Sequence, residues 1–148
     1  MNKTFWLRVI MGKHKIHNLI NLLKKDGYLV GPNDYRFYFS KYDAKQIKRL
    51  FEFCIKYGVI FSKTEGYWNY TDNIVTTSSN IKFNLKMFDP LIFSETFLAD
   101  IHFSNFDLKN KIVVQAGGFI GDTALYYSSR GAKVFSFEPD INSYQLAL

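Results

Sequence analysis

The sequence contains very little cysteine, since Cys54 is the only one in 148 residues. A single thiol cannot form an internal disulfide, and it lacks the paired spacing of metal-binding cysteines. Cys54 falls within the apolar pattern of an expected helix, so we interpret it as a small core residue. The sequence therefore predicts neither a disulfide framework nor a metal site.

Long apolar runs are also missing, and no stretch of about 20 apolar residues could cross a membrane. The apolar residues around Trp6 and Ile10 are interrupted by Arg8 and closed by Lys13. A signal peptide normally has a longer apolar region and a small-residue cleavage site. We therefore expect a cytoplasmic protein without a membrane partner.

Acidic residues are fewer than basic ones, 13 against 19, which gives a net charge of +6. The basic side chains are scattered along the chain, so a solvated surface is favoured over a nucleic-acid site. The composition is 47% hydrophobic and 18% aromatic, which is typical of a folded chain. A length of 148 residues fits one domain with a sizeable core.

Residues 1–58 are expected to form a helical N-terminal extension without visible chemistry. A helix is predicted over 4–25, in two pieces joined near Gly12, and a short strand over 35–40. A second helix is predicted to begin at Asp43, with Gln46 completing a capping box, and to end at Gly58. The expected core-facing residues are Ile16, Leu19, Ile20 and Leu23 in the first helix, and Ile47, Leu50, Phe51, Cys54 and Ile55 in the second.

Residues 59–110 are expected to contain antiparallel strands and a helix. The four candidate strands cover residues 59–61, 66–70, 74–77 and 81–88. In the last of these, apolar residues alternate with lysines and Asn84, which predicts a half-buried strand with a wet face. A helix should then start at Asp89-Pro90 and run to about His102.

The histidines offer weak candidates for chemistry. His14 and His17 are three residues apart, but no neighbouring carboxylate or cysteine supports a metal site, so both are interpreted as surface residues. His102 precedes the next strand and is a candidate proton acceptor, although a lone histidine is more often structural. No catalytic residue is assigned.

Residues 111–140 show the pattern of a nucleotide-binding unit. An apolar run at 112–114 predicts a buried strand, and a glycine-bearing turn follows it. A helix is expected over 123–130, and a second buried strand, 134–137, ends at Glu138. The glycines of the turn, Gly117, Gly118 and Gly121, allow positive φ and close approach of a ligand.

A carboxylate at the tip of the second strand can accept both hydroxyls of a ribose. Glu138 lies about 20 residues beyond the first glycine, which is the spacing expected for that role. The start of the expected helix, at Asp122 and Thr123, presents unpaired N–H groups to a polar or negatively charged ligand. The alternative is an ordinary strand–turn–helix with incidental glycines.

A family resemblance rests on three short motifs, which read VQAGGFIGDTALY over 114–126, GAKV over 131–134 and FEPD over 137–140. They resemble the FkbM-type methyltransferases, enzymes that use S-adenosylmethionine to methylate hydroxyl oxygens, often on sugars or polyketides. The resemblance implies a Rossmann-like fold and a small-molecule or glycan hydroxyl as substrate. It implies cofactor-binding roles for Gln115, Gly117, Gly118, Gly121, Asp122, Thr123 and Glu138.

Two positions depart from the family motif, which usually reads V-D-x-G-A-N-x-G-D-x-A. Gln115 stands at the position of the motif Asp, and Phe119 at that of the motif Asn. The sequence ends at Leu148, early in what should be the next helix. We therefore expect 111–148 to be the first βαβ of an incomplete cofactor-binding domain. We expect it to bind the cofactor weakly or not at all, and the chain to self-associate or to need a missing C-terminal half.

The predicted class is α/β, with N-terminal helices and antiparallel strands leading into a truncated Rossmann-like methyltransferase sheet. A rival is a non-catalytic interaction or regulatory module that keeps half of the fold. A dinucleotide-dependent oxidoreductase ranks below both, because Ala116 occupies the first glycine position of a G-x-G-x-x-G turn.

Overall fold

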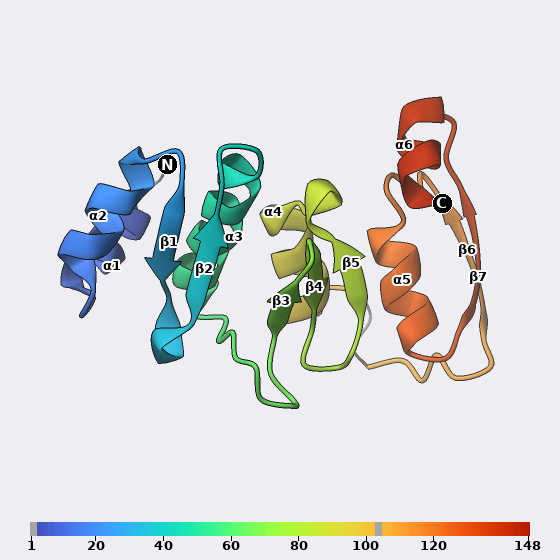
Figure 1. Ribbon diagram of the computed structural model, residues 1–148. Coiled ribbons are helices and arrows are strands. Elements are labelled where there is room, and N and C mark those ends of the chain that lie inside the picture. Colours follow the sequence, from blue (N-terminus) through green and yellow to red (C-terminus); the bar gives the residue numbers. More distant parts are fainter. Residues whose placement is uncertain (1–2, 103–104) are drawn as a thin grey trace. The chain divides into compact units, whose positions relative to one another are not determined.

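The computed structural model describes residues 3–102 and 105–148, and it shows a mixed α/β protein. The chain divides into two compact units, which we call the N-terminal unit (up to Lys86) and the C-terminal unit (from Met87). Each unit has its own helices and small sheet (Figure 1). The α/β class expected from the sequence is confirmed.

Among the described residues, no helix combines the length and apolar character needed to cross a membrane.

The N-terminal unit begins with two helices, a hairpin and a third helix. Its elements are α1 (Lys3–Met11), α2 (Lys15–Leu23), β1 (Gly27–Val30), a 3₁₀ turn η1 (Pro32–Asp34), β2 (Arg36–Phe39) and α3 (Ala44–Tyr57). Strands β1 and β2 pair antiparallel from Gly27↔Phe39 to Val30↔Arg36. Helix α2 packs against β1 and α3 against β2. The predicted break of the first helix near Gly12 is confirmed, whereas β1 was not predicted.

Edge-to-face aromatic contacts build the core of the N-terminal unit. The ring of Phe37 lies 6.0 Å from that of Phe51 and 5.2 Å from that of Phe61. All three side chains are fully buried. Cys54 is buried beside them, and its thiol donates a hydrogen bond to the Val59 carbonyl. Burial raises the pKa of Cys54 to about 12, so it behaves as the expected core residue.

Helix α2 buries a different face from the one predicted. Asn18 and Asn21 are buried, while Ile16, Ile20 and Leu23 are exposed. The cause is tertiary: the Asn18 amide donates to the Val30 carbonyl at 2.9 Å and accepts from the Val30 N–H at 2.8 Å. A buried strand end needs these bonds, because an unpaired buried backbone group is costly. The polar positions of the helix therefore face inward.

Three short antiparallel strands complete the N-terminal unit: β3 (Asn69–Thr71), β4 (Ile74–Thr76) and β5 (Lys82–Asn84). Of the four candidate strands, the one at 59–61 is only an isolated bridge between Phe61 and Trp68. The strand expected over 81–88 is shorter than predicted, because Leu85–Met87 turn into a 3₁₀ helix, η2.

The C-terminal unit starts with α4 (Pro90–Phe93), which continues as a short π-helical segment, η3 (Ser94–Leu98). The predicted helix start at Asp89-Pro90 is confirmed. The Asp89 carboxylate caps α4, accepting from the Leu91 and Ile92 N–H groups at 2.9 and 3.3 Å. The helical stretch stops at Leu98 and does not reach His102. The unit continues with β6 (Ile112–Ala116), α5 (Asp122–Ser129), β7 (Lys133–Phe137) and α6 (Ile141–Ala147).

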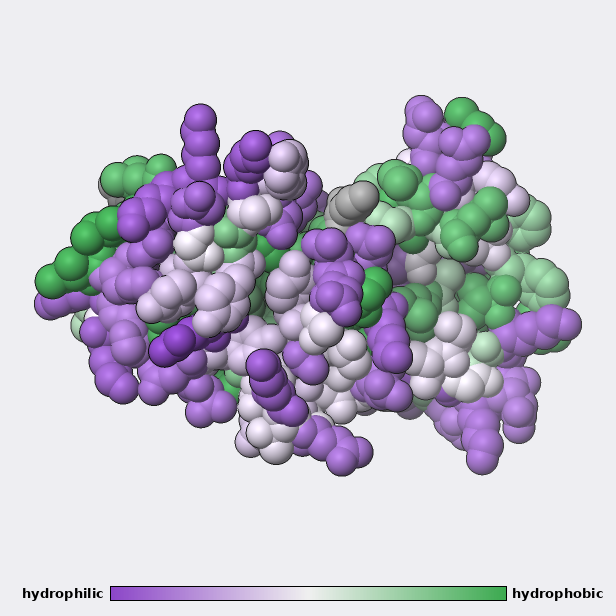
Figure 2. Space-filling model, viewed as in Figure 1, coloured by the Kyte–Doolittle hydropathy of each residue, from purple (hydrophilic) through white to green (hydrophobic). Residues whose placement is uncertain are grey.

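Strands β6 and β7 run parallel, in register from Ile112↔Lys133 to Ala116↔Phe137. Helix α5 connects them and packs against β7 (Figure 1). The other face of the strand pair is exposed to solvent, since Ile112 and Val114 are both 70% exposed and Phe137 is 63% exposed. In Figure 2, apolar side chains gather on the surface over these elements. The two strands were expected to be buried, and this prediction is wrong: no residue of β6 or β7 is buried, and the face toward α5 is at most half-buried.

Candidate functional site

A five-residue loop, 117–121, connects β6 to α5 at the carboxyl ends of the two parallel strands. The N–H groups of Gly117 and Gly118 both donate to the Phe137 carbonyl, at 2.9 and 3.0 Å. Gly117 has φ +79° and Gly121 has φ +82°, conformations that side chains rarely adopt. The loop is therefore fixed to the end of β7 by backbone bonds that depend on glycine geometry.

Gly118 is the buried point of this loop. A Cβ atom at this position would collide with the Ser136 hydroxyl oxygen on β7. A Cβ at Gly117, in contrast, would meet no atom within 4 Å. The first glycine thus borders open space where a ligand can approach, while the second permits close packing of loop and strand.

Glu138 connects the loop to the segment after β7. One carboxylate oxygen accepts from the Phe119 N–H at 2.7 Å, and the other accepts from the Asp140 N–H at 2.8 Å. Each carboxylate oxygen has two lone-pair sites, so both keep a further site for a ligand hydroxyl. The sequence placed Glu138 at the tip of a strand, and the structure brings it into direct contact with the loop.

Gln115 connects the two strands beneath the loop. Its amide oxygen accepts from the Ser136 hydroxyl at 3.2 Å, and its amide nitrogen lies 3.5 Å from the Gly117 carbonyl. The Gln115 side chain is therefore engaged in contacts within this unit, with Ser136 of β7 and with the start of the loop.

Asp122 opens helix α5 and is buried, with 6% of its surface exposed. One carboxylate oxygen accepts from the Thr123 N–H at 2.8 Å. Within the described part of the chain, the other oxygen, Oδ2, is buried without a hydrogen-bond partner. Burial raises the pKa of Asp122 above its ordinary value. An unpaired carboxylate oxygen at this point suits a ligand group that carries positive charge or donates a hydrogen bond.

Phe119 has an unusual backbone conformation for a bulky residue, with φ +46°. Asn adopts positive φ several-fold more readily than most residues. The Phe119 side chain is 46% exposed, on the surface of the loop.

His102, the candidate proton acceptor, lies among aromatic rings. Its ring centroid is 5.9 Å from that of Tyr126 and 6.3 Å from that of Tyr127. Burial raises the pKa of Asp122, and a positive charge on His102 would act in the opposite direction, as a smaller effect. These contacts describe a packed ring and assign it no catalytic role.

Sequence reasoning missed a polar cluster next to α5. The Tyr126 hydroxyl donates to Asp100, and the Arg130 guanidinium pairs with the same carboxylate at 2.9 Å. Arg130 also lies 4.6 Å from the centre of the Tyr126 ring. Burial, and then the Asp100 contact, raise the pKa of Tyr126 to about 12. These residues are too far apart in sequence for any motif to reveal the cluster.

No group of histidine, cysteine or carboxylate side chains in the described ranges could hold a metal ion. Comparisons with protein-family models, curated proteins and solved structures find no match to this chain. The geometry of the loop and Glu138 is therefore the basis for a functional proposal.

Proposed function

We propose that the β6–α5–β7 segment binds S-adenosylmethionine and that the chain contributes this site to the methylation of a hydroxyl on a small molecule or glycan. One observation supports the proposal most directly: the Phe119 N–H bonds to the Glu138 carboxylate at 2.7 Å. This contact joins the glycine loop and the strand-end acid at the carboxyl edge of a parallel pair, the position where α/β folds bind nucleotides. A Rossmann-like fold for the C-terminal unit is part of the same proposal.

Three groups would hold the cofactor. Glu138 offers its remaining lone pairs to the ribose hydroxyls, and the open space beside Gly117 admits the ligand backbone. The unpaired Oδ2 of Asp122 suits the cationic part of the cofactor, which carries an ammonium and a sulfonium. The bound cofactor supplies an electrophilic methyl group. No residue is assigned as the proton acceptor.

Binding is tested by NMR titration of the ¹⁵N-labelled chain with S-adenosylhomocysteine, the stable product form of the cofactor. We expect a dissociation constant in the millimolar range, with shifts concentrated at residues 117–123. Glu138→Gln should weaken binding about ten-fold, the scale of about 1.4 kcal/mol for one charge-assisted contact. Glu65→Gln, an exposed change in the N-terminal unit, is the matched control.

Two results would overturn the proposal. One is the absence of shifts in the loop at 10 mM ligand. The other is equal affinity for the wild type and Glu138→Gln. A parallel titration with NAD separates the cofactor classes, because a dinucleotide-binding site would bind NAD more tightly than S-adenosylhomocysteine.

The second candidate is a non-catalytic interaction module. The bare face of β6–β7 favours it, because parallel strands are normally covered on both faces. Sedimentation velocity of the wild type and of Val114→Lys tests this candidate. If the variant no longer associates, and S-adenosylhomocysteine does not shift the NMR signals of residues 117–123, the interaction module is the better account.

A further inference from the structure

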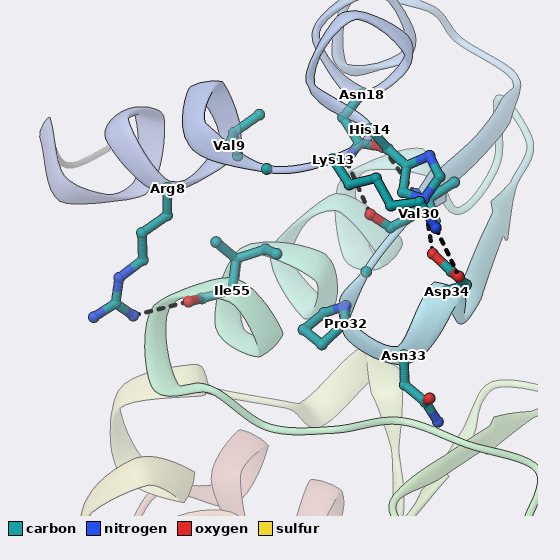
Figure 3. A pocket seen from close by; sticks show the side chains of 12 residues that line it. Arg8, Val9, Lys13, His14, Asn18, Val30, Pro32, Asn33, Asp34 and Ile55 are labelled. Atoms are coloured by element: carbon teal, nitrogen blue, oxygen red, sulfur yellow. Dashed lines mark hydrogen bonds and ion pairs between the residues drawn. The ribbon is translucent and has the colours of Figure 1, made fainter.

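The N-terminal unit contains a pocket of about 310 Å³ that the sequence did not indicate. Its walls come from α1, α2, the β1–β2 turn and α3, which are brought together by the fold (Figure 3). Pockets that hold small ligands range from roughly 300 to 1,000 Å³. The volume therefore suits a compact molecule.

The floor and sides of the pocket are largely apolar, with Val9, Val30, Pro32 and Ile55 around the hollow (Figure 3). Asn18 also borders it, but both ends of its amide are engaged by Val30. A ligand here would place its hydrocarbon part against these side chains.

One end of the pocket carries a paired group of charges. Asp34 contacts the His14 imidazole at 2.7 Å and the Lys13 ammonium at 3.3 Å (Figure 3). The hydrogen bond from His14, followed by Lys13, lowers the pKa of Asp34. Asn33 and Asp34 have φ values of 59° and 55°, which suit a tight hairpin turn and hold Asp34 in place. The carboxylate at this end is thus already paired with side chains of the chain.

Arg8 also lines the pocket; it is an exposed residue, and its guanidinium is fixed by the end of α3. One guanidinium nitrogen, Nη1, donates to the Ile55 and Lys56 carbonyls. No hydrogen bond within the described part of the chain uses Nη2 or Nε. A guanidinium held by backbone carbonyls, with donors remaining, is pre-organised to pair with an anion.

We propose that this pocket binds a small organic monoanion, with its carboxylate on Arg8 and its hydrocarbon part against Val9 and Ile55. With His14 neutral, the charged groups lining the pocket carry one positive charge in excess, because Asp34 balances Lys13. The proposal concerns the N-terminal unit alone and does not depend on the cofactor site.

The test compares an acid with its neutral analogue on the full chain. Hexanoate and hexanamide have similar size and differ in charge, and ¹⁵N NMR reports binding at Gly12, Gly31 and Ile55. We expect millimolar binding of hexanoate and at least five-fold weaker binding of hexanamide. Equal affinity of the two probes would overturn the proposal without any variant.

Variants then locate the anion contact. Arg8→Met should weaken hexanoate binding at least five-fold, while Arg36→Met, which removes an exposed arginine of β2 outside the pocket, should leave it unchanged. Arg8→Lys should recover part of the affinity, since it restores the charge but not the guanidinium geometry. If Arg36→Met weakens binding as much as Arg8→Met, the attraction comes from the overall positive charge and the proposed site is wrong.

Discussion

The two units are both rich in apolar residues but bury them very differently. In the N-terminal unit, Phe5, Phe37, Phe51, Phe53 and Phe61 are all fully buried. Among the described residues of the C-terminal unit, only Thr96 reaches the same degree of burial. The share of apolar residues therefore does not decide how many of them are buried. In the N-terminal unit, helices pack against the β1–β2 hairpin, whereas the parallel pair β6–β7 has a helix on only one face. The proposed cofactor loop lies in the unit with less buried surface.

The largest expected effect is the loss of a buried aromatic ring. Phe37→Ala should lower the free energy of unfolding of the N-terminal unit by about 3–5 kcal/mol, because it removes a large apolar surface and leaves a cavity. Phe137→Ala, at an exposed ring of β7, should cost the C-terminal unit less than about 1 kcal/mol. Urea denaturation monitored by NMR resolves the two units. Similar costs at the two positions would contradict the contrast in burial.

Next in size is Gly118→Ala, which tests how closely the loop approaches β7. The added methyl group would force the Ser136 hydroxyl away from Gln115, at a cost of about 1–2 kcal/mol to the C-terminal unit. In a Ser136→Ala background the same substitution should cost less than about 0.5 kcal/mol. Denaturation of the four proteins of this cycle gives the coupling. Additive costs would show that the two residues do not meet.

Asp122→Asn is expected to stabilise the C-terminal unit by about 1 kcal/mol at pH 7, because it neutralises a buried carboxylate that has one oxygen without a hydrogen-bond partner. The raised pKa means that the folded chain holds this proton more tightly than the unfolded chain. Stability from this group is therefore present below the ordinary value of 3.8 and lost as pH rises through the folded pKa. The stability gained by Asp122→Asn should vanish at low pH.

The same substitution should weaken the binding of S-adenosylhomocysteine. Unchanged affinity for this ligand would show that Asp122 is not part of the proposed site.

The smallest effect concerns Phe119. Phe119→Asn should stabilise the C-terminal unit by about 0.5–1 kcal/mol, because Asn tolerates the observed positive φ better than Phe. Phe119→Val is the matched comparison and should destabilise the unit, since a β-branched residue disfavours this conformation. Thermal unfolding measures both variants, and the opposite order of stability would contradict the loop geometry.

Local signals in the sequence predicted several elements that depend on neighbouring residues. The capping box expected at Asp43 and Gln46 is wrong, because the Asp43 carboxylate accepts from the N–H and hydroxyl of Ser40 and caps no N–H of α3. Helix α3 ends at Gly58, whose φ of +68° suits a helix C-terminus, and the glycine loop follows β6 as expected. The buried face of α2 was mispredicted because Asn18 bonds to Val30 of β1, a contact between distant segments. The same limit applies to the site. Glycine spacing indicated the loop and Glu138, but no pattern could reveal the bond between Phe119 and Glu138 or the pocket beside Arg8.

Amide hydrogen exchange with and without S-adenosylhomocysteine tests the central claim, that the cofactor binds the C-terminal unit through the loop and Glu138. At a ligand concentration ten times the dissociation constant, binding stabilises the folded unit by about 1.4 kcal/mol. Amides of β6 and β7 should then exchange about ten-fold more slowly, while amides of α3 in the N-terminal unit keep their rates. Unchanged rates in β6 and β7, or equal slowing in α3, would contradict the claim.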